Sequence, residues 1–126
     1  MSGFSTFLAN QIINDTLVVP YATRYLALFV ADPTDANITA NEVSGAWYAR
    51  VSTGSWASPT DGVTTNNGTI QYNPVVGNQV SISHWGVYDA PVAGNLLYSG
   101  AFATPKAFNV DDFPIVGPGD LDISLL

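Results

Sequence analysis

Short apolar segments separated by turn residues recur along most of this chain, and they limit the folds that it can adopt. Strands are expected near 69–73, 79–88, 95–102 and 121–125, and the segment 25–30 is apolar on both faces of a strand. Short strands at spacings of roughly ten residues, with Gly and Pro turns, are typical of antiparallel β-sandwiches. Because a strand that is apolar on both faces must be covered on both sides, 25–30 is expected inside a sheet.

The first residues predict one amphipathic helix over about 3–14, with Ser2 available as its N-cap. The apolar residues at helical spacing are Phe4, Phe7, Leu8 and Ile12. A helix this short is not stable alone, so this stripe is expected to dock on the sandwich or on a neighbouring subunit. The predicted fold is mainly β, a single domain over 1–126. It comprises an N-terminal helix within 1–14 and a small antiparallel β-sandwich, Ig-like or jelly-roll-like, over 20–126.

The segment 79–88 contains a change of phase. Its first large residues, Val80 and Ile82, stand at even positions, whereas the next ones, Trp85 and Val87, stand at odd positions. In a regular strand these two pairs would point to opposite faces. One extra residue at His84 or Gly86 would return all four to a single buried face, which is what a β-bulge does. The sequence therefore predicts a bulge in this strand, followed by a hairpin loop at 91–94.

The charge balance limits the possible partners. Ten acidic and three basic residues give a net charge of −7, whereas binding to a nucleic-acid backbone requires clustered Lys and Arg. No apolar run approaches the roughly 20 residues that cross a bilayer, and the N-terminus lacks the basic start of a signal peptide. We expect no nucleic-acid or membrane partner and synthesis in the cytoplasm of a host cell. Without cysteine, neither a disulfide framework nor a thiolate zinc site is expected.

Few residues are candidates for chemistry. Ser83, His84 and Asp89 suggest a nucleophile, a base and an orienting carboxylate, but neighbours on a strand point to opposite faces, and a histidine satisfied beside the sheet is favoured. The C-terminal acidic residues are Asp111, Asp112, Asp120 and Asp122. Their spacing lacks the alternating ligands of a calcium loop and favours a solvated acidic face. We expect no catalytic residue, cofactor or metal, and no enzymatic activity.

Four segments carry a resemblance to a known family. They are Ser5–Asn10, Tyr25–Asp35 (YLALFVADPTD), Glu42–Arg50 (EVSGAWYAR) and His84–Gly100 (HWGVYDAPVAGNLLYSG). In this order they resemble small structural proteins of tailed bacteriophages and prophages, which are labelled tail fibre proteins or capsid decoration (cement) proteins. The resemblance implies a virion structural protein and transfers no catalytic residue, because the shared motifs consist of aromatic and turn residues.

Within that class, we expect a capsid decoration subunit that binds the major capsid protein on the outer capsid surface and stabilises the shell. A compact acidic domain suits the outside of a DNA container, whereas a fibre usually needs length or repeats. Self-association is also expected, with a trimer favoured. The predicted interface residues are Phe4, Phe7, Leu8, Ile12, Trp47, Tyr48 and Arg50.

The alternative is a tail fibre or tail-tip protein that recognises host-surface glycans. In this hypothesis, Trp47, Tyr48 and Trp56 stack on sugar rings. Aromatic side chains in a small sandwich are more often core residues, so a core or interface role is favoured for all three. Their exposure to solvent distinguishes the two hypotheses.

Overall fold

The N-terminal part of the protein is helical. The computed structural model describes residues 3–126, in which helix α1 (Thr6–Ile13) continues into a π-helical turn, η1 (Asn14–Val18), and a 3-10 turn, η2 (Tyr21–Thr23). Ser5 caps α1, because its Oγ accepts a hydrogen bond from Leu8 N at 3.1 Å. The cap predicted at Ser2 lies outside the described residues. None of the helices within 3–126 is long and apolar enough to cross a bilayer.

The largest sheet is antiparallel and has four strands in the order β2-β1-β5-β6. Its strands are β1 (Tyr25–Phe29), β2 (Val51–Ser52), β5 (Val80–Tyr88) and β6 (Leu96–Phe108), and the 3-10 turn η3 (Thr39–Asn41) lies between β1 and β2. Strand β1 lies between β2 and β5, and four of its five residues are buried. The prediction of an internal strand at 25–30 is therefore confirmed.

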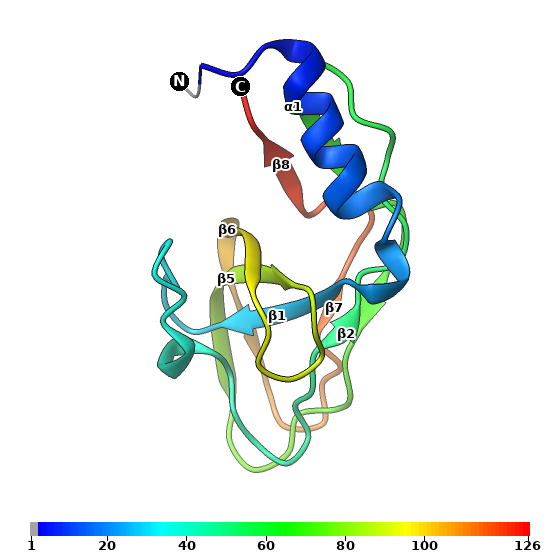
Figure 1. Cartoon of the computed structure of the whole chain (residues 1–126). Coiled ribbons are helices and arrows are strands. Elements are labelled where there is room, and N and C mark those ends of the chain that lie inside the picture. Colours follow the sequence, from blue (N-terminus) through cyan, green and yellow to red (C-terminus); the bar gives the residue numbers. More distant parts are fainter. Residues whose placement is uncertain (1–2) are drawn as a thin grey trace.

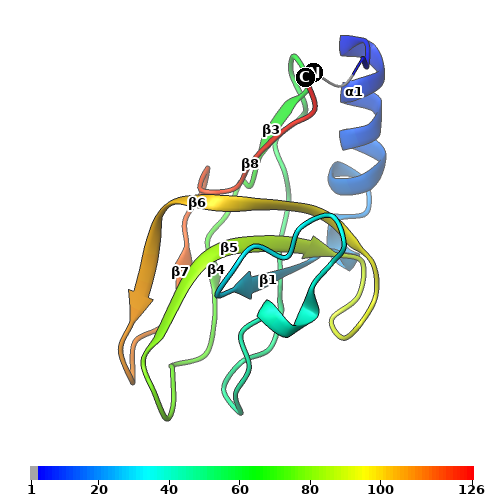
Figure 2. The same ribbon diagram turned by 90° about the vertical axis from the view of Figure 1, so that its left-hand side faces the viewer.

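Two short ribbons make the rest of the β structure. β3 (Val63–Thr65) pairs with β8 (Asp122–Ser124), and β4 (Ile70–Gln71) pairs with β7 (Ile115–Val116), all antiparallel. Figures 1 and 2 show α1 and the β3–β8 ribbon together at one end of the four-stranded sheet. A mainly β, antiparallel fold with one short helix is thus confirmed. The remaining strands are only two or three residues long. They form two separate two-stranded ribbons joined by loops, and not a continuous second sheet.

The main core lies between the sheet and the ribbons. It includes the buried residues Leu26, Leu28, Trp47, Trp56, Ile70, Tyr72, Ile82, Trp85, Val87, Val116 and Ile123. A second, smaller cluster on the other face of β1 contains Ala27, Phe29 and Tyr88, with Leu96 packed against it. Strand β1 is therefore covered on both faces, as its sequence requires.

The pairing of β5 is irregular near the predicted position, but the extra residues belong to β6 and not to β5. Ile82 pairs with Lys106 and His84 pairs with Ala101, so Ser83 on β5 and residues 102–105 on β6 fall between the two pairs. The register shift places Ile82 and Trp85, which have opposite parity in the sequence, in the same core cluster. The irregular pairing accommodates the phase change, although not through an extra residue in β5 as predicted.

Helix α1 packs against the rest of the protein through a different face from the one predicted. Its buried residues are Ala9 and Ile13, and Leu17 continues the same face in η1. Phe7 is 76% exposed and Leu8 is 43% exposed, so neither docks on the sandwich, and docking on a neighbouring subunit stays a prediction for both. Small Ala9 permits close packing beside Gly62, whose N–H donates to Asn10 Oδ1 at 2.8 Å. A phenylalanine side chain would hold the helix further away.

Gly100 allows β6 to lie directly on Trp85. A Cβ atom at this position would stand 2.6 Å from Trp85 Cζ2, well inside van der Waals contact. We expect Gly100→Ala to lower the free energy of unfolding by about 1–3 kcal/mol, because the fixed indole cannot move aside. Gly68→Ala is the matched control, since a Cβ there meets no atom within 4 Å. Urea unfolding of both variants measures the difference, and equal stabilities would contradict the packing argument.

Candidate functional site

A polar pocket of about 420 Å³ lies between the loop that follows β1 and strands β5 and β6. We call it the Asp32 pocket, and its lining residues are Asp32, Thr34, Asp35, His84, Ser99, Gly100 and Ala101. A neighbouring pocket of about 350 Å³ follows β6 toward Leu96 and shares Asp35 and Ser99 with it. The two pockets therefore lie next to each other beside β6.

His84 has a defined orientation in this pocket. Its Nδ1 lies 2.7 Å from Ser83 Oγ, and the Ser83 hydroxyl donates a hydrogen bond to Val30 O at 3.2 Å. These two contacts hold the His84 ring beside Ser83. The other ring nitrogen, Nε2, lies 4.0 Å from Asp32 Oδ2.

The Asp32 carboxylate is oriented by its own loop. Its Oδ1 accepts a hydrogen bond from Thr34 N at 2.8 Å, and its backbone carbonyl accepts one from Asn41 Nδ2 at 3.1 Å. Thr34 has a positive φ of 56°, which turns the chain back at this point. These contacts leave Oδ2 directed toward His84.

The structure brings together only two of the three residues that suggested a hydrolase. Ser83 and His84 are hydrogen-bonded, but Asp89 accepts hydrogen bonds from Asn95 N at 2.7 Å and from Asn95 Nδ2 at 2.9 Å. These bonds stabilise the ionised carboxylate and lower the pKa of Asp89. The carboxylate nearest to His84 belongs to Asp32 instead, so Ser83, His84 and Asp89 do not form one cluster.

The C-terminal acidic residues serve separate turns. Asp112 Oδ2 accepts a hydrogen bond from Asn109 N, and Asp120 Oδ2 accepts one from Gly117 N and lies 3.5 Å from Lys106 Nζ. Within residues 3–126, no group of three or more His, Cys, Asp or Glu side chains is arranged to hold a metal ion.

Two of the predicted interface residues, Tyr48 and Arg50, belong to a buried polar network. The Arg50 guanidinium contacts both carboxylate oxygens of Glu42 at 2.9 Å, and the two side chains are 6% and 14% exposed. Arg50 also donates to the carbonyls of Ala90 and Ala93. Its Cζ lies 3.7 Å from the centroid of the Tyr88 ring, a cation–π contact. Arg50 thereby joins the segment before β2 to the loop between β5 and β6.

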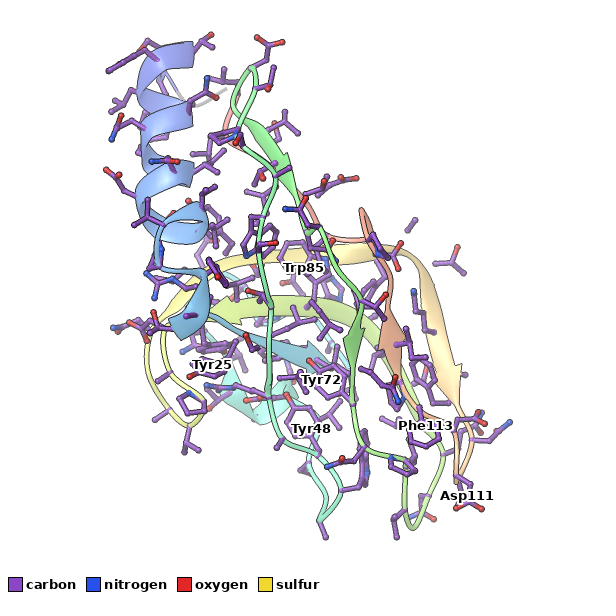
Figure 3. All side chains as sticks on the ribbon, turned by 90° about the vertical axis from the view of Figure 1, so that its right-hand side faces the viewer. Tyr25, Tyr48, Tyr72, Trp85, Asp111 and Phe113 are labelled. Carbon is purple, nitrogen blue, oxygen red and sulfur yellow. The ribbon has the colours of Figure 1, made fainter. Side chains whose placement is uncertain are left out.

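Tyr48 connects this network to the central strand. Its hydroxyl donates to Glu42 Oε2 at 2.6 Å and accepts a hydrogen bond from Leu28 N at 3.1 Å. The Tyr48 ring stacks on Tyr72, whose hydroxyl donates to Leu26 O, and Figure 3 shows these two tyrosines beside each other. Burial raises the pKa of both phenols, and the Glu42 carboxylate raises that of Tyr48 further.

Trp47 and Trp56 are core residues. They are 8% and 3% exposed, and Trp56 Nε1 donates a hydrogen bond to Thr53 Oγ1. Because neither ring reaches solvent, the hypothesis that these tryptophans stack on sugars is wrong.

The remaining predicted interface residues lie on the N-terminal helical segment. Phe4 is 39% exposed, Phe7 and Leu8 are exposed, and Ile12 is half-buried. Residues 1–14 include no charged residue, although the chain as a whole carries a net charge of −7. The exposed side chains of Phe7 and Leu8 therefore form an uncharged apolar patch, which we call the helix patch.

Comparison with known proteins gives a family assignment. The model of the family described as podophage GP4 fiber I protein gp80 matches residues 3–124, which include all four segments that resembled phage structural proteins. No curated protein matches the chain significantly. Because the match extends over nearly the whole sequence, the chain belongs to the podophage GP4 fiber I protein gp80 family of phage fibre-type structural proteins.

Proposed function

We propose that this protein is a subunit of a fibre on the outside of a tailed-phage particle. The observation that carries the proposal is the family match over residues 3–124, because the family description names a fibre protein. The structure is consistent with a structural role, since its strongest polar contacts join its own segments to one another.

The alternative, a capsid decoration subunit bound to the major capsid protein, has less support. The argument from sequence was that a fibre needs length or repeats, but a compact subunit also builds an elongated structure when copies associate head to tail. The compact shape and the net charge of −7 suit either location. The family description supports the fibre, and a tail or fibre component is then the expected neighbour.

Imaging of labelled particles tests the location. Leu126 is 48% exposed, so a short C-terminal tag is accessible to nanogold. We expect gold particles on tail appendages in negative-stain images of virions that carry the tagged protein. Untagged virions are the control for background labelling. Gold distributed over the capsid faces would reject the fibre and restore the decoration hypothesis.

We further propose that copies of this chain associate through the helix patch. Copies with a net charge of −7 repel one another, so association is favoured at surfaces without charge. The helix patch meets this condition and exposes apolar side chains that association would bury. A trimer remains the expected form.

Sedimentation of a charged variant tests this association. Phe7→Asp introduces a like charge into the helix patch, and we expect it to sediment as a monomer under conditions where the wild type is oligomeric. Val92→Asp is the matched control, because Val92 is 79% exposed in the loop between β5 and β6 and should not affect assembly. A monomeric wild type at high concentration would reject the proposal, as would a Phe7→Asp variant that remains oligomeric.

A further inference from the structure

We propose that Asn67 is a site of spontaneous deamidation, at which the chain converts to aspartate and isoaspartate as it ages. Asn67 is followed by Gly68, and both residues are exposed in the link between β3 and β4. Deamidation begins when a backbone nitrogen attacks the side-chain carbon of the preceding asparagine. Glycine favours this attack, because it has no Cβ to obstruct the approach and its backbone moves freely. Among the asparagines of the chain, only Asn67 precedes a glycine.

The reaction consumes only water. The Gly68 nitrogen forms a bond to Asn67 Cγ, the bond from Cγ to Nδ2 breaks, and the Gly68 amide proton leaves with Nδ2 as ammonia. The product is a five-membered imide ring. Water then opens this ring at one of its two carbonyl carbons, which gives either aspartate or isoaspartate, whose main chain passes through Cγ. Neither step requires an oxidant, a metal or an enzyme.

The attacking nitrogen is free in the folded protein. Within residues 3–126, the Gly68 N–H donates no hydrogen bond, and a Cβ at this position would meet no atom within 4 Å. The hydrogen bonds nearby hold other atoms, since Asn67 N donates to Ser55 O at 3.0 Å and Gly68 O accepts from Asn66 Nδ2 at 2.9 Å. The Asn67 side-chain amide donates to Ser55 Oγ at 3.2 Å, between two exposed side chains. Water replaces such a contact readily, so the amide turns toward Gly68 at low cost.

A second pair, Asp61 and Gly62, shows the protected arrangement. Aspartate before glycine forms the same ring with loss of water, but here the Gly62 N–H donates to Asn10 Oδ1 at 2.8 Å. A Cβ at Gly62 would stand 2.7 Å from Leu126 Cγ, so this nitrogen lies in a crowded and buried environment. The nitrogen of Gly62 is therefore neither free nor accessible. The fold thus protects one of the two pairs and leaves Asn67 open to the reaction.

The position of Asn67 gives its conversion a structural effect. The adjacent Asn66 is 2% exposed, and its Nδ2 donates to Gly68 O and Gly117 O while its Oδ1 accepts from Leu121 N. Asn66 thereby ties the link between β3 and β4 to the loop before β8. Isoaspartate at position 67 lengthens the main chain by one atom and displaces Gly68 O from Asn66. Either product also adds one negative charge to a chain with a net charge of −7.

The biological meaning of this inference rests on the proposed role as a virion component. Subunits of a particle are not replaced after assembly, so converted copies accumulate with the age of the particle. The reaction itself belongs to the isolated chain and is measured without the virion. Gold on the capsid would reject the fibre and leave the deamidation result intact, whereas an unconverted chain with gold on the appendages would reject only the deamidation site.

Mass spectrometry of the purified protein during storage at mildly alkaline pH tests the site. We expect the mass of the chain to rise by the difference between an amide and a carboxylic acid. Peptide mapping should assign this change to Asn67 and separate an aspartate form from an isoaspartate form. A synthetic peptide of residues 64–70 gives the rate without the fold, and the folded protein should convert within about tenfold of that rate. A protein that stays unchanged while the peptide converts would overturn the proposal, as would a change that maps to another asparagine.

Two variants test the route of the reaction. Gly68→Ala places a methyl group beside the attacking nitrogen, and the fold accepts it because the position is open and its φ lies outside the left-handed region. We expect conversion at least about tenfold slower in this variant. Gly100→Ala is the control, because it lowers stability without touching the link, and its rate should equal that of the wild type. Equal rates in Gly68→Ala and the wild type would overturn the proposal. Faster conversion in Gly100→Ala would also overturn it, because the reaction would then proceed through the unfolded chain.

Discussion

Replacement of Arg50 by alanine is expected to lower the free energy of unfolding by about 3–5 kcal/mol. Without the guanidinium, the nearly buried Glu42 carboxylate loses its only salt-bridge partner within the described residues 3–126, and the Ala90 and Ala93 carbonyls lose a donor. The Tyr88 ring also loses its cation–π contact. Urea unfolding followed by tryptophan fluorescence measures the loss, because Trp47, Trp56 and Trp85 lie in the core.

Two other substitutions separate burial from charge. Lys106→Ala removes a 3.5 Å ion pair whose side chains are 34% and 41% exposed, so it should cost less than about 1 kcal/mol. Arg50→Lys keeps the charge but cannot make the two-pronged contact with Glu42, and an intermediate loss is expected. Equal effects of Arg50→Ala and Lys106→Ala would show that the Arg50 network contributes no more than a surface pair.

Above pH 10 the protein is expected to lose stability steeply. Burial raises the pKa of Tyr48 and Tyr72 above the ordinary value of 10.0, so the folded state favours the neutral phenols. The contribution of each is present in full below pH 10 and declines as the pH rises, because only the unfolded chain releases the proton. At about pH 12 Tyr48 alone removes about 3 kcal/mol, at about 1.36 kcal/mol per pH unit, and Tyr72 adds to this loss.

Tyrosinate absorbance and circular dichroism during an alkaline titration check this expectation. Tyr48 and Tyr72 should ionise only as the fold is lost. Tyr72→Phe removes one of the linked protons, so the decline of its unfolding free energy with pH should be less steep. This variant is less stable at neutral pH, because Leu26 O loses its donor. Ionisation of both phenols in a fully folded protein would contradict the linkage.

Much of the β structure can be predicted from local pattern. The apolar run at 25–30 identifies the internal strand, and the change of parity between Ile82 and Trp85 identifies where the pairing of β5 is irregular, but not that the extra residues lie on β6. Strands β2, β4 and β7 are two residues long and β3 and β8 are three, which is too short for a periodic signal. Their positions depend on tertiary pairing, so only the strands expected near 69–73 and 121–125 indicate any of them.

The helix shows how a correct periodicity can identify the wrong face. Phe4, Phe7 and Leu8 repeat at helical spacing, but so do Ala9, Ile13 and Leu17, and the smaller set is buried. Hydrophobicity favours the aromatic stripe, whereas close approach to Gly62 requires a small side chain. Both helix faces can be recognised in the sequence. Which of them is buried depends on the shape of the surface against which the helix packs, and the local sequence does not indicate that shape.

The Asp32 pocket was not predicted, because its central residues are distant in sequence. His84 was a candidate, but its carboxylate neighbour was expected at Asp89, five positions away, and Asp32 lies 52 positions away in a turn. The antiparallel pairing of β1 with β5, in which Phe29 lies opposite His84, brings the turn after β1 to this side chain. The pairing register therefore determines the pocket, and nothing in the local sequence indicates it.

Strand β6 has 13 residues and forms an outer edge of the four-stranded sheet, yet it is a poor template for another chain. Residues 102–105 have no partner on β5, Pro105 has no N–H to donate, and Figure 2 shows β6 bending sharply along its length. An irregular edge resists strand-to-strand growth. We therefore expect crowded copies of this protein to resist the fibrillar aggregation that a straight, unpaired edge would promote.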